Sequence, residues 1–102
     1  MSRKICVQFE VRDMLIMKDT LKQMGHDFIE KGQDIVQIQR SYHPIEINGK
    51  TGDISYDEMN VSEVNKIKQE YMLAFYKDQG IKEGMSLRET RLNNGDIELH
   101  LL

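Results

Sequence analysis

The 102-residue chain has no tryptophan, one proline and one cysteine, and it lacks any long hydrophobic run. The lone Cys6 excludes an internal disulfide, and its place between Ile5 and Val7 in an apparent strand favours an inert, packed thiol. The longest apolar run, Met14 to Met17, is far shorter than a signal-peptide core or a membrane span. We therefore expect a soluble cytoplasmic protein with no membrane partner.

The chain also has no segment in which charges of one sign are concentrated. Fourteen basic and seventeen acidic residues leave a net charge of −3, and neither sign gathers into a block. A surface that follows a phosphate backbone therefore has no electrostatic support. Base stacking on a sheet needs exposed aromatic residues, whereas Phe9 falls in the expected buried phase and Phe28 at the periphery. We expect no nucleic acid partner.

The remaining composition is that of a folded domain. Hydrophobic residues make up 39% of the chain and charged residues 30%, a balance unlike that of disordered chains. A chain of this length can bury one modest core but not two independent ones. The sequence predicts a single domain over residues 1–102.

The first third of the chain predicts a strand and a helix. Alternating apolar residues from Ile5 to Val11, including Phe9, indicate a strand with one buried face. Asp13 is placed to cap the helix that follows, and Gly25 to end it. Residues at helical spacing form its buried stripe. They are Met14, Met17, Leu21 and Met24.

Two strand pairs are expected next. His26 to Glu30 and Asp34 to Arg40 predict strands that meet at Lys31-Gly32-Gln33. Between Tyr42 and Asp57, Asn48-Gly49 separates two short apolar stretches, which we interpret as a second, smaller hairpin. Those stretches are Ile45 to Ile47 and Ile54 to Tyr56.

The second helix has the spacing of a capping box at Asn60 and Glu63, with Met59 and Val64 as a hydrophobic staple. Its apolar stripe favours a helix that ends at Gly80. The stripe comprises Val64, Ile67, Tyr71, Ala74 and Phe75.

The chain then closes with a hairpin, for which a two-residue turn at Asn94-Gly95 is expected. That turn would place Arg91 opposite Glu98, and Glu89 opposite His100, as complementary cross-strand pairs. It would also place Leu92 on the core face, and Leu87 and Leu102 on the charged face.

The order of these segments is β-α-β-β-(β-β)-α-β-β. It predicts the α+β class, with two helices on one face of a mainly antiparallel sheet, related to the ferredoxin-like sandwiches.

No pattern in the chain carries catalytic, cofactor or metal chemistry. Gly49-Lys50-Thr51 resembles the end of a phosphate-binding loop, but Pro44 stands where the loop needs a glycine. Asp53, Ser55 and Asp57 alternate like calcium ligands, yet Glu58 occupies the obligatory glycine position of such a loop. The three histidines, His26, His43 and His100, have no paired spacing. We assign no catalytic residue, no cofactor and no metal site.

What remains is a polar sheet face and a stripe on the second helix. An open, glutamine-rich face can hold a partner by hydrogen bonds, or be joined to a second copy at its edges. The residues expected on that face are Gln8, Glu10, Gln37, Gln39, Glu89, Arg91, Glu98 and His100. On the second helix, Leu73, Met72 and Tyr76 are expected to face partly outward. We take Gln8, Gln37, Gln39, Arg91, His100, Met72 and Tyr76 as the candidate partner-binding surface.

Several short sequence segments resemble those of a known family. The chain is similar to the hypothetical chloroplast reading frame thirty-five family in four segments. They are Val11-Arg12-Asp13, which leads into Leu21 to Phe28, and then Tyr71 to Gly80 and Asn94-Gly95-Asp96. That family comprises uncharacterised small domains from cyanobacteria, plastids, other bacteria and some phages. The resemblance covers about the first and last thirty residues, and it implies a fold and a soluble location but no catalytic residue.

Three hypotheses about function follow. The first is a non-enzymatic protein-interaction module, with homodimerisation as one form, that binds through the open sheet face or the second helix. The second is a protein that binds a small polar ligand between subunits or under the Tyr42 to Asp57 loop, or a phage-encoded inhibitor of a host component. The third is a small acid/base enzyme that uses His43 or His100 with a neighbouring glutamate.

Overall fold

Five strands form one antiparallel sheet, in the computed structural model, which describes residues 3–9, 11–82 and 87–101. The strand order is β1-β5-β4-β3-β2, and every neighbouring pair is antiparallel. The strands are β1 (Lys4–Gln8), β2 (Ile29–Glu30), β3 (Ile35–Ile38), β4 (Ile45–Asn48) and β5 (Asp53–Asp57). The expected Lys31-Gly32-Gln33 turn joins β2 to β3, and the expected second hairpin is β4–β5 at the middle of the sheet.

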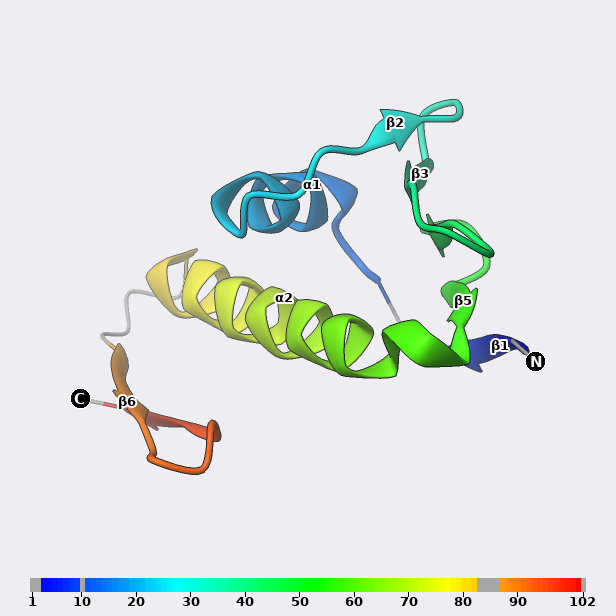
Figure 1. The fold of residues 1–102 in the computed structure, drawn as a ribbon. Helices are drawn as coiled ribbons and strands as arrows, with labels where there is room; N and C mark the ends of the chain where they lie inside the picture. The colour runs from blue at the N-terminus through cyan, green and yellow to red at the C-terminus, as the bar shows by residue number, and fades with distance from the viewer. Residues whose placement is uncertain (1–2, 10, 83–86, 102) are drawn as a thin grey trace.

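Two helices, α1 (Met14–Gln23) and α2 (Val61–Lys82), lie on the same side of this sheet (Figure 1). A short 3-10 helix, η1 (Glu58–Asn60), leads from β5 into α2. The predicted α+β class and the predicted order of elements are therefore confirmed. In the part of the chain that the structure describes, no helix is long and apolar enough to cross a membrane.

The core lies between the sheet and the helices. One row of paired residues crosses the sheet on that side, from Val36 through Ile47 and Ile54 to Val7. The helices contribute the buried side chains Met17, Leu21, Val64, Ile67 and Tyr71. Alternation along the strands therefore places apolar residues on one face and leaves the polar residues on the other.

The predicted start of α1 is confirmed. The Asp13 carboxylate accepts the N–H groups of Leu15 and Ile16 at 3.0 and 3.2 Å. Gly25 has a φ of 84°, a conformation that glycine adopts without strain, and the chain leaves the helix there.

The predicted capping box of α2 is wrong. The Asp57 carboxylate accepts the Met59 N–H at 2.9 Å and starts η1, which runs directly into α2. The Glu63 side chain binds Arg40 instead of the Asn60 backbone. Met59 is 70% exposed, so it makes no staple with the buried Val64.

The predicted end of α2 at Gly80 is also wrong, because the helix continues to Lys82 with Gly80 buried inside it. A glycine inside a helix costs only about 1 kcal/mol, which packing readily offsets.

The closing hairpin consists of β6 (Leu87–Arg91) and β7 (Ile97–Leu101), which form a separate two-stranded sheet on the side of α2 away from α1 (Figure 1). Its predicted register is wrong by one residue, since Arg91 pairs with Ile97 and Thr90 with Glu98. Likewise Glu89 pairs with Leu99, and Arg88 with His100. The expected charge pairs therefore do not stand opposite each other.

The turn of this hairpin explains the register. Gly95 has a φ of 93°, and its N–H donates to the Leu92 C=O at 3.0 Å, while the Leu92 N–H donates to the Asp96 C=O at 2.8 Å. Asn93, Asn94 and Gly95 thus form a three-residue loop with glycine at its left-handed position. The Asn94 side chain stabilises it by accepting the Asp96 N–H at 3.0 Å. Leu92 was expected on the core face, but it is 38% exposed and lies outside the core. Leu102 lies outside the described residues.

Candidate functional site

The sheet face opposite the helices carries a continuous row of mostly polar residues. The strand pairing places Cys6, Ser55, Glu46, Gln37 and Ile29 side by side across all five strands. The Gln37 Nε2 atom donates to the Glu46 Oε1 atom at 2.7 Å. Cys6 is exposed, contrary to the expected packed thiol, because its position in the strand points away from the core. This face offers hydrogen-bonding groups and one thiol.

Two hydrogen bonds at the ends of β1 show which of its backbone groups point toward β5. The Phe9 N–H donates to the Gly52 C=O at 2.6 Å, and the Glu58 N–H donates to the Arg3 C=O at 2.8 Å. Backbone direction alternates along a strand, so the N–H and C=O groups of Ile5 and Val7 also point toward β5.

The backbone groups of Lys4, Cys6 and Gln8 therefore point away from β5. Within residues 3–9, 11–82 and 87–101, no strand pairs with β1 on that outer side. Three N–H donors and three C=O acceptors thus form a template that can pair with another strand.

The opposite edge of the sheet is protected. Strand β2 has only two residues, and short edge strands pair poorly with other chains. The Lys18 Nζ atom lies 2.7 Å from Glu30 Oε1, at this edge. The hydrogen bond and charge of Lys18 lower the pKa of Glu30 below its ordinary value, which favours the charged carboxylate. The two edges of the sheet are therefore unequal, and β1 is the open one.

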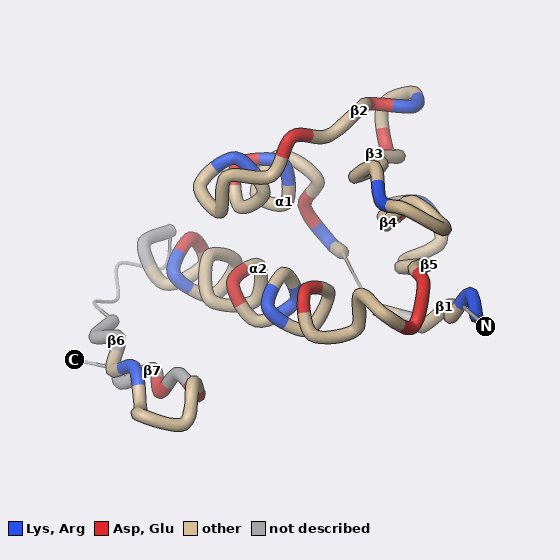
Figure 2. Tube along the Cα trace, in the orientation of Figure 1, with Lys and Arg blue, Asp and Glu red and all other residues tan. Residues whose placement is uncertain are grey.

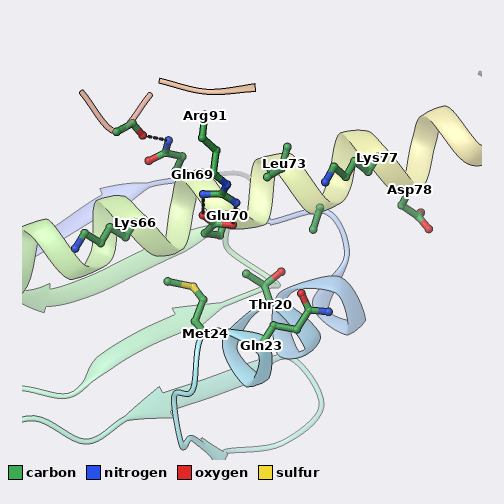
Figure 3. A pocket seen from close by; sticks show the side chains of 12 residues that line it. Thr20, Gln23, Met24, Lys66, Gln69, Glu70, Leu73, Lys77, Asp78 and Arg91 are labelled. Carbon is green, nitrogen blue, oxygen red and sulfur yellow. Dashed lines mark hydrogen bonds and ion pairs between the residues drawn. The ribbon is translucent and has the colours of Figure 1, made fainter. Parts of the chain in front are cut away.

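A groove of about 830 Å³ lies between α1, α2 and the hairpin (Figure 3). The Arg91 guanidinium binds the Glu70 carboxylate through two hydrogen bonds of 2.9 and 3.2 Å. The Gln69 Nε2 atom donates to the Gly95 C=O at 2.8 Å. These contacts attach the hairpin to α2. Acidic and basic residues alternate along both helices, without a long stretch of one sign (Figure 2).

A second polar cluster joins three elements on the helix side of the sheet. Arg40, just after β3, binds both carboxylate oxygens of Glu63 in the first turn of α2. The His26 Nδ1 atom lies 3.5 Å from Glu63 Oε1 and 3.4 Å from the Arg40 Nη2 atom. The hydrogen bond from Arg40 lowers the pKa of Glu63, and the same bond raises the pKa of Arg40. A glutamate held charged in this way suits a structural ion pair better than a general acid near neutral pH.

The structure separates the residues expected on one polar face. Gln37 lies on the open face, and Gln8 occupies the position next to Asp53 on that face. Gln39 follows β3 and lines a small cavity with Arg40. Arg91, Glu98 and His100 belong to the separate hairpin and not to this sheet, because the hairpin forms its own sheet. Glu10 and the side chains of Gln8, Glu89 and His100 lie outside the described parts of the chain.

The helix stripe is also divided. Leu73 is only 6% exposed and does not face outward as expected, whereas Met72 is partly buried against the core and partly exposed. Tyr76 is 49% exposed and packs edge-to-face on Phe75, with ring centroids 5.9 Å apart. Helix α2 lies between α1 and the hairpin (Figure 1).

Sequence reasoning missed Cys6, Glu46 and Ser55 as residues of the open face. Glu46 stands between Ile45 and Ile47, and the same alternation places Ser55 between two apolar residues. That period-two signal could have assigned both residues to the polar face. The pairing that brings them beside Gln37 required the strand order.

Comparison of the chain with protein-family models, curated proteins and solved structures finds no match. The resemblance to the chloroplast reading frame family therefore stays a prediction.

Proposed function

We propose that this chain is a non-enzymatic protein-interaction module that accepts a strand from a partner protein at the outer edge of β1. The observation that carries the proposal is the row of outward backbone groups at Lys4, Cys6 and Gln8, beside an open polar sheet face. Main-chain hydrogen bonds to an added strand supply affinity, and the side chains on the two faces supply specificity.

The surroundings of the edge support this function. Ile5 and Val7 are partly buried on the core side of β1, so an added strand would cover more of their apolar surface. On the other side, Cys6 and the Gln37–Glu46 pair offer polar contacts to a partner that extends over the face. A reducing cytoplasmic compartment belongs to the proposal, because it keeps the exposed Cys6 as a thiol.

Proline at position 6 tests the proposal. The Cys6 N–H points away from β5, so Cys6→Pro removes an outward donor without removing a bond to β5. Tagged wild-type and Cys6→Pro proteins are incubated with lysate from the source cells, and bound proteins are quantified by mass spectrometry. We expect a partner that the wild type retains and Cys6→Pro loses by about tenfold.

Two controls make the result specific. Cys6→Ser removes the thiol but keeps the backbone donor, so it should retain the partner. Tyr76→Ser changes a side chain of α2 that is 49% exposed, and it should also retain the partner. Hydrogen exchange should slow at the amides of Lys4, Cys6 and Gln8 in the complex. Partners bound equally by wild type and Cys6→Pro, with no slowing at these amides, would contradict the proposal.

The groove between α1, α2 and the hairpin favours a second function, the binding of a small polar ligand. Its volume of about 830 Å³ is within the range of ligand sites, and Gln23, Lys66 and Gln69 line it with hydrogen-bonding groups (Figure 3). A metabolite that binds only the folded state should raise the melting temperature of the wild type. The same metabolite should have a smaller effect on Lys66→Ala, and equal shifts in both proteins would exclude the groove.

A further inference from the structure

We infer that the strand added at β1 is β1 of a second copy of this chain, paired antiparallel about a two-fold axis at Cys6. The inference rests on the proposed strand addition and names its partner. The outer edge of β1 is complementary to a second copy of itself in its outward backbone groups and in its apolar side chains.

The outward backbone groups select the register. In an antiparallel pair, each outward-pointing residue must stand opposite an outward-pointing residue of the other strand. With the axis at Cys6, Lys4 stands opposite Gln8 of the second copy, and Cys6 opposite Cys6. All three outward residues of β1 then find partners within the strand, which spans Lys4–Gln8. An axis at Val7 would instead leave Lys4 without a partner inside the other β1.

The apolar side supports the same register. Ile5 and Val7 both face the core, and both are only partly buried because β1 is at the edge. With the axis at Cys6, Ile5 stands opposite Val7 of the second copy, and Val7 opposite Ile5. Two close β-branched pairs would extend the apolar layer across the axis.

The polar side shows charge complementarity. Asp53 pairs with Gln8, and Asp57 pairs with Lys4, within one copy. In the proposed register, Lys4 of one copy lies beside Gln8 of the other, and Asp53 of that copy follows on the next strand. Asp57 is only 1% exposed and caps η1, so the acidic residue on this surface is Asp53. Lys4 of one copy lies two strands from Asp53 of the other, and no like charges stand opposite each other. An axis at Lys4 would place two lysines directly against each other.

The product is a continuous ten-stranded sheet, since each copy contributes five strands. Residues that face each other across an antiparallel pair share one face of a sheet. Both helix layers therefore lie on the same side, the polar faces merge on the other, and the isologous contact closes without further addition. The short β2 strands become the two outer edges.

The pairing places two thiols within bonding range. Residues in a hydrogen-bonded antiparallel pair have Cα atoms about 5.5 Å apart, which lies within the range that a disulfide spans. Both Cys6 side chains would project from the open face. Oxidation of the dimer should therefore link Cys6 to Cys6, whereas the reduced dimer needs no covalent bond.

Sedimentation and oxidation test the inference on the full chain. We expect sedimentation equilibrium to show twice the 12.0 kDa monomer mass under reducing conditions. Diamide should then produce a disulfide-linked dimer, as two thiols give two electrons and two protons to the diamide. The same oxidation in urea, where the pairing is absent, should be about tenfold slower at equal protein concentration. A reduced monomer at all concentrations, or equal oxidation rates in both buffers, would overturn the inference.

Variants separate pairing from thiol chemistry. Cys6→Ser should remain dimeric and give no covalent dimer, while Cys6→Pro should weaken dimerisation by about tenfold. Gln8→Pro removes another outward N–H and guards against a folding defect particular to position 6. Circular dichroism checks that each proline variant is folded. A folded Cys6→Pro or Gln8→Pro protein that dimerises as well as the wild type would contradict pairing through β1.

The register has its own test. In a Cys6→Ser background, the double variant Lys4→Cys and Gln8→Cys should form covalent dimers on oxidation, because positions 4 and 8 face each other across the axis. Lys4→Cys alone in that background should not. The dimer and the proposed function can fail separately. If the wild type is a monomer but captures a partner protein that Cys6→Pro does not capture, the edge of β1 accepts a strand from another protein and not from a second copy.

Discussion

Tyr71 shows how one side chain can hold two distant segments together. Its hydroxyl oxygen accepts the backbone N–H groups of Arg12 and Asp13 at 2.9 and 3.2 Å, although these residues lie almost sixty positions earlier. The residue is 1% exposed, and its ring packs edge-to-face on Phe9 with centroids 5.8 Å apart. The chain entering α1 is therefore fixed to the middle of α2 by a buried oxygen.

Tyr71→Phe should lower the free energy of unfolding by about 1–3 kcal/mol, because it removes a buried acceptor and leaves the ring in place. Urea unfolding measures the change. Tyr76→Phe is the matched control, since Tyr76 is 49% exposed, and it should alter stability by less than about 0.5 kcal/mol. Equal losses in the two variants would show that the hydroxyl contacts of Tyr71 contribute nothing.

The Arg40–Glu63 pair predicts a pH-dependent loss of stability. Arg40 lowers the folded-state pKa of Glu63, so the pair stabilises the fold above the ordinary pKa of glutamate. That stabilisation is lost as the pH falls through the lower, folded-state pKa. Glu63→Gln should therefore cost about 1 kcal/mol near neutral pH, and the gap to the wild type should narrow in acid.

Thermal unfolding between neutral and acidic pH measures this gap. Arg40→Gln should show the same weaker dependence of stability on pH as Glu63→Gln. Without the guanidinium, the hydrogen bond that lowers the pKa of Glu63 is absent. A gap that stays constant over the whole pH range would mean that the pair is not the source of the stabilisation.

At the scale of elements, α1 packs closely on the turn between β4 and β5. A Cβ atom added at Gly49 would lie 2.6 Å from Met14 Cγ and 2.9 Å from Met14 Sδ. Contacts this short force neighbouring atoms to move. The glycine therefore provides space for the first residue of α1, and its φ is not positive.

Gly49→Ala should destabilise the protein by about 1–3 kcal/mol through overpacking against Met14. Met14→Ala empties that space, so the double variant should be more stable than the sum of the two single losses predicts. A double-mutant cycle by urea unfolding measures this coupling. Strictly additive losses would show that the two residues do not compete for space.

At the scale of the whole molecule, the protein is a five-stranded sheet with two covering helices and an added hairpin. The described contacts between hairpin and helix include the Arg91–Glu70 ion pair and the Gln69–Gly95 hydrogen bond. Arg91 is 56% exposed in this pair, so its energy is small. A two-stranded sheet has little stability of its own.

Backbone amides of β7 should therefore exchange with solvent faster than those of β4 and β5, which lie inside the sheet. Glu70→Gln should speed exchange in β7 further and leave β4 unchanged. Hydrogen exchange followed by NMR measures both elements in one sample. Equal protection of the hairpin and the central strands, or equal acceleration in both, would contradict this division of the molecule.

Local chemistry was sufficient to predict much of the fold. The Asp13 cap, the Gly25 stop, the glycine turn at Gly32 and the alternation in β4 and β5 are short-range features, and each appears where its residues predict it. Errors fell where several local solutions compete. Either of two capping aspartate or asparagine residues could start α2, and Asn94-Gly95 suits a two-residue or a three-residue loop.

The sequence by itself determined the elements, their order and which side of β1, β3, β4 and β5 is apolar, because these depend on residues close together in the chain. Tertiary structure decided that β1 pairs with β5 and leaves an open edge, and that the hairpin forms a separate sheet. It also decided that Arg40 meets Glu63. Such pairings depend on residues far apart in the chain, whose contacts form only when the helices pack on the sheet, and the proposed interaction surface is made of them.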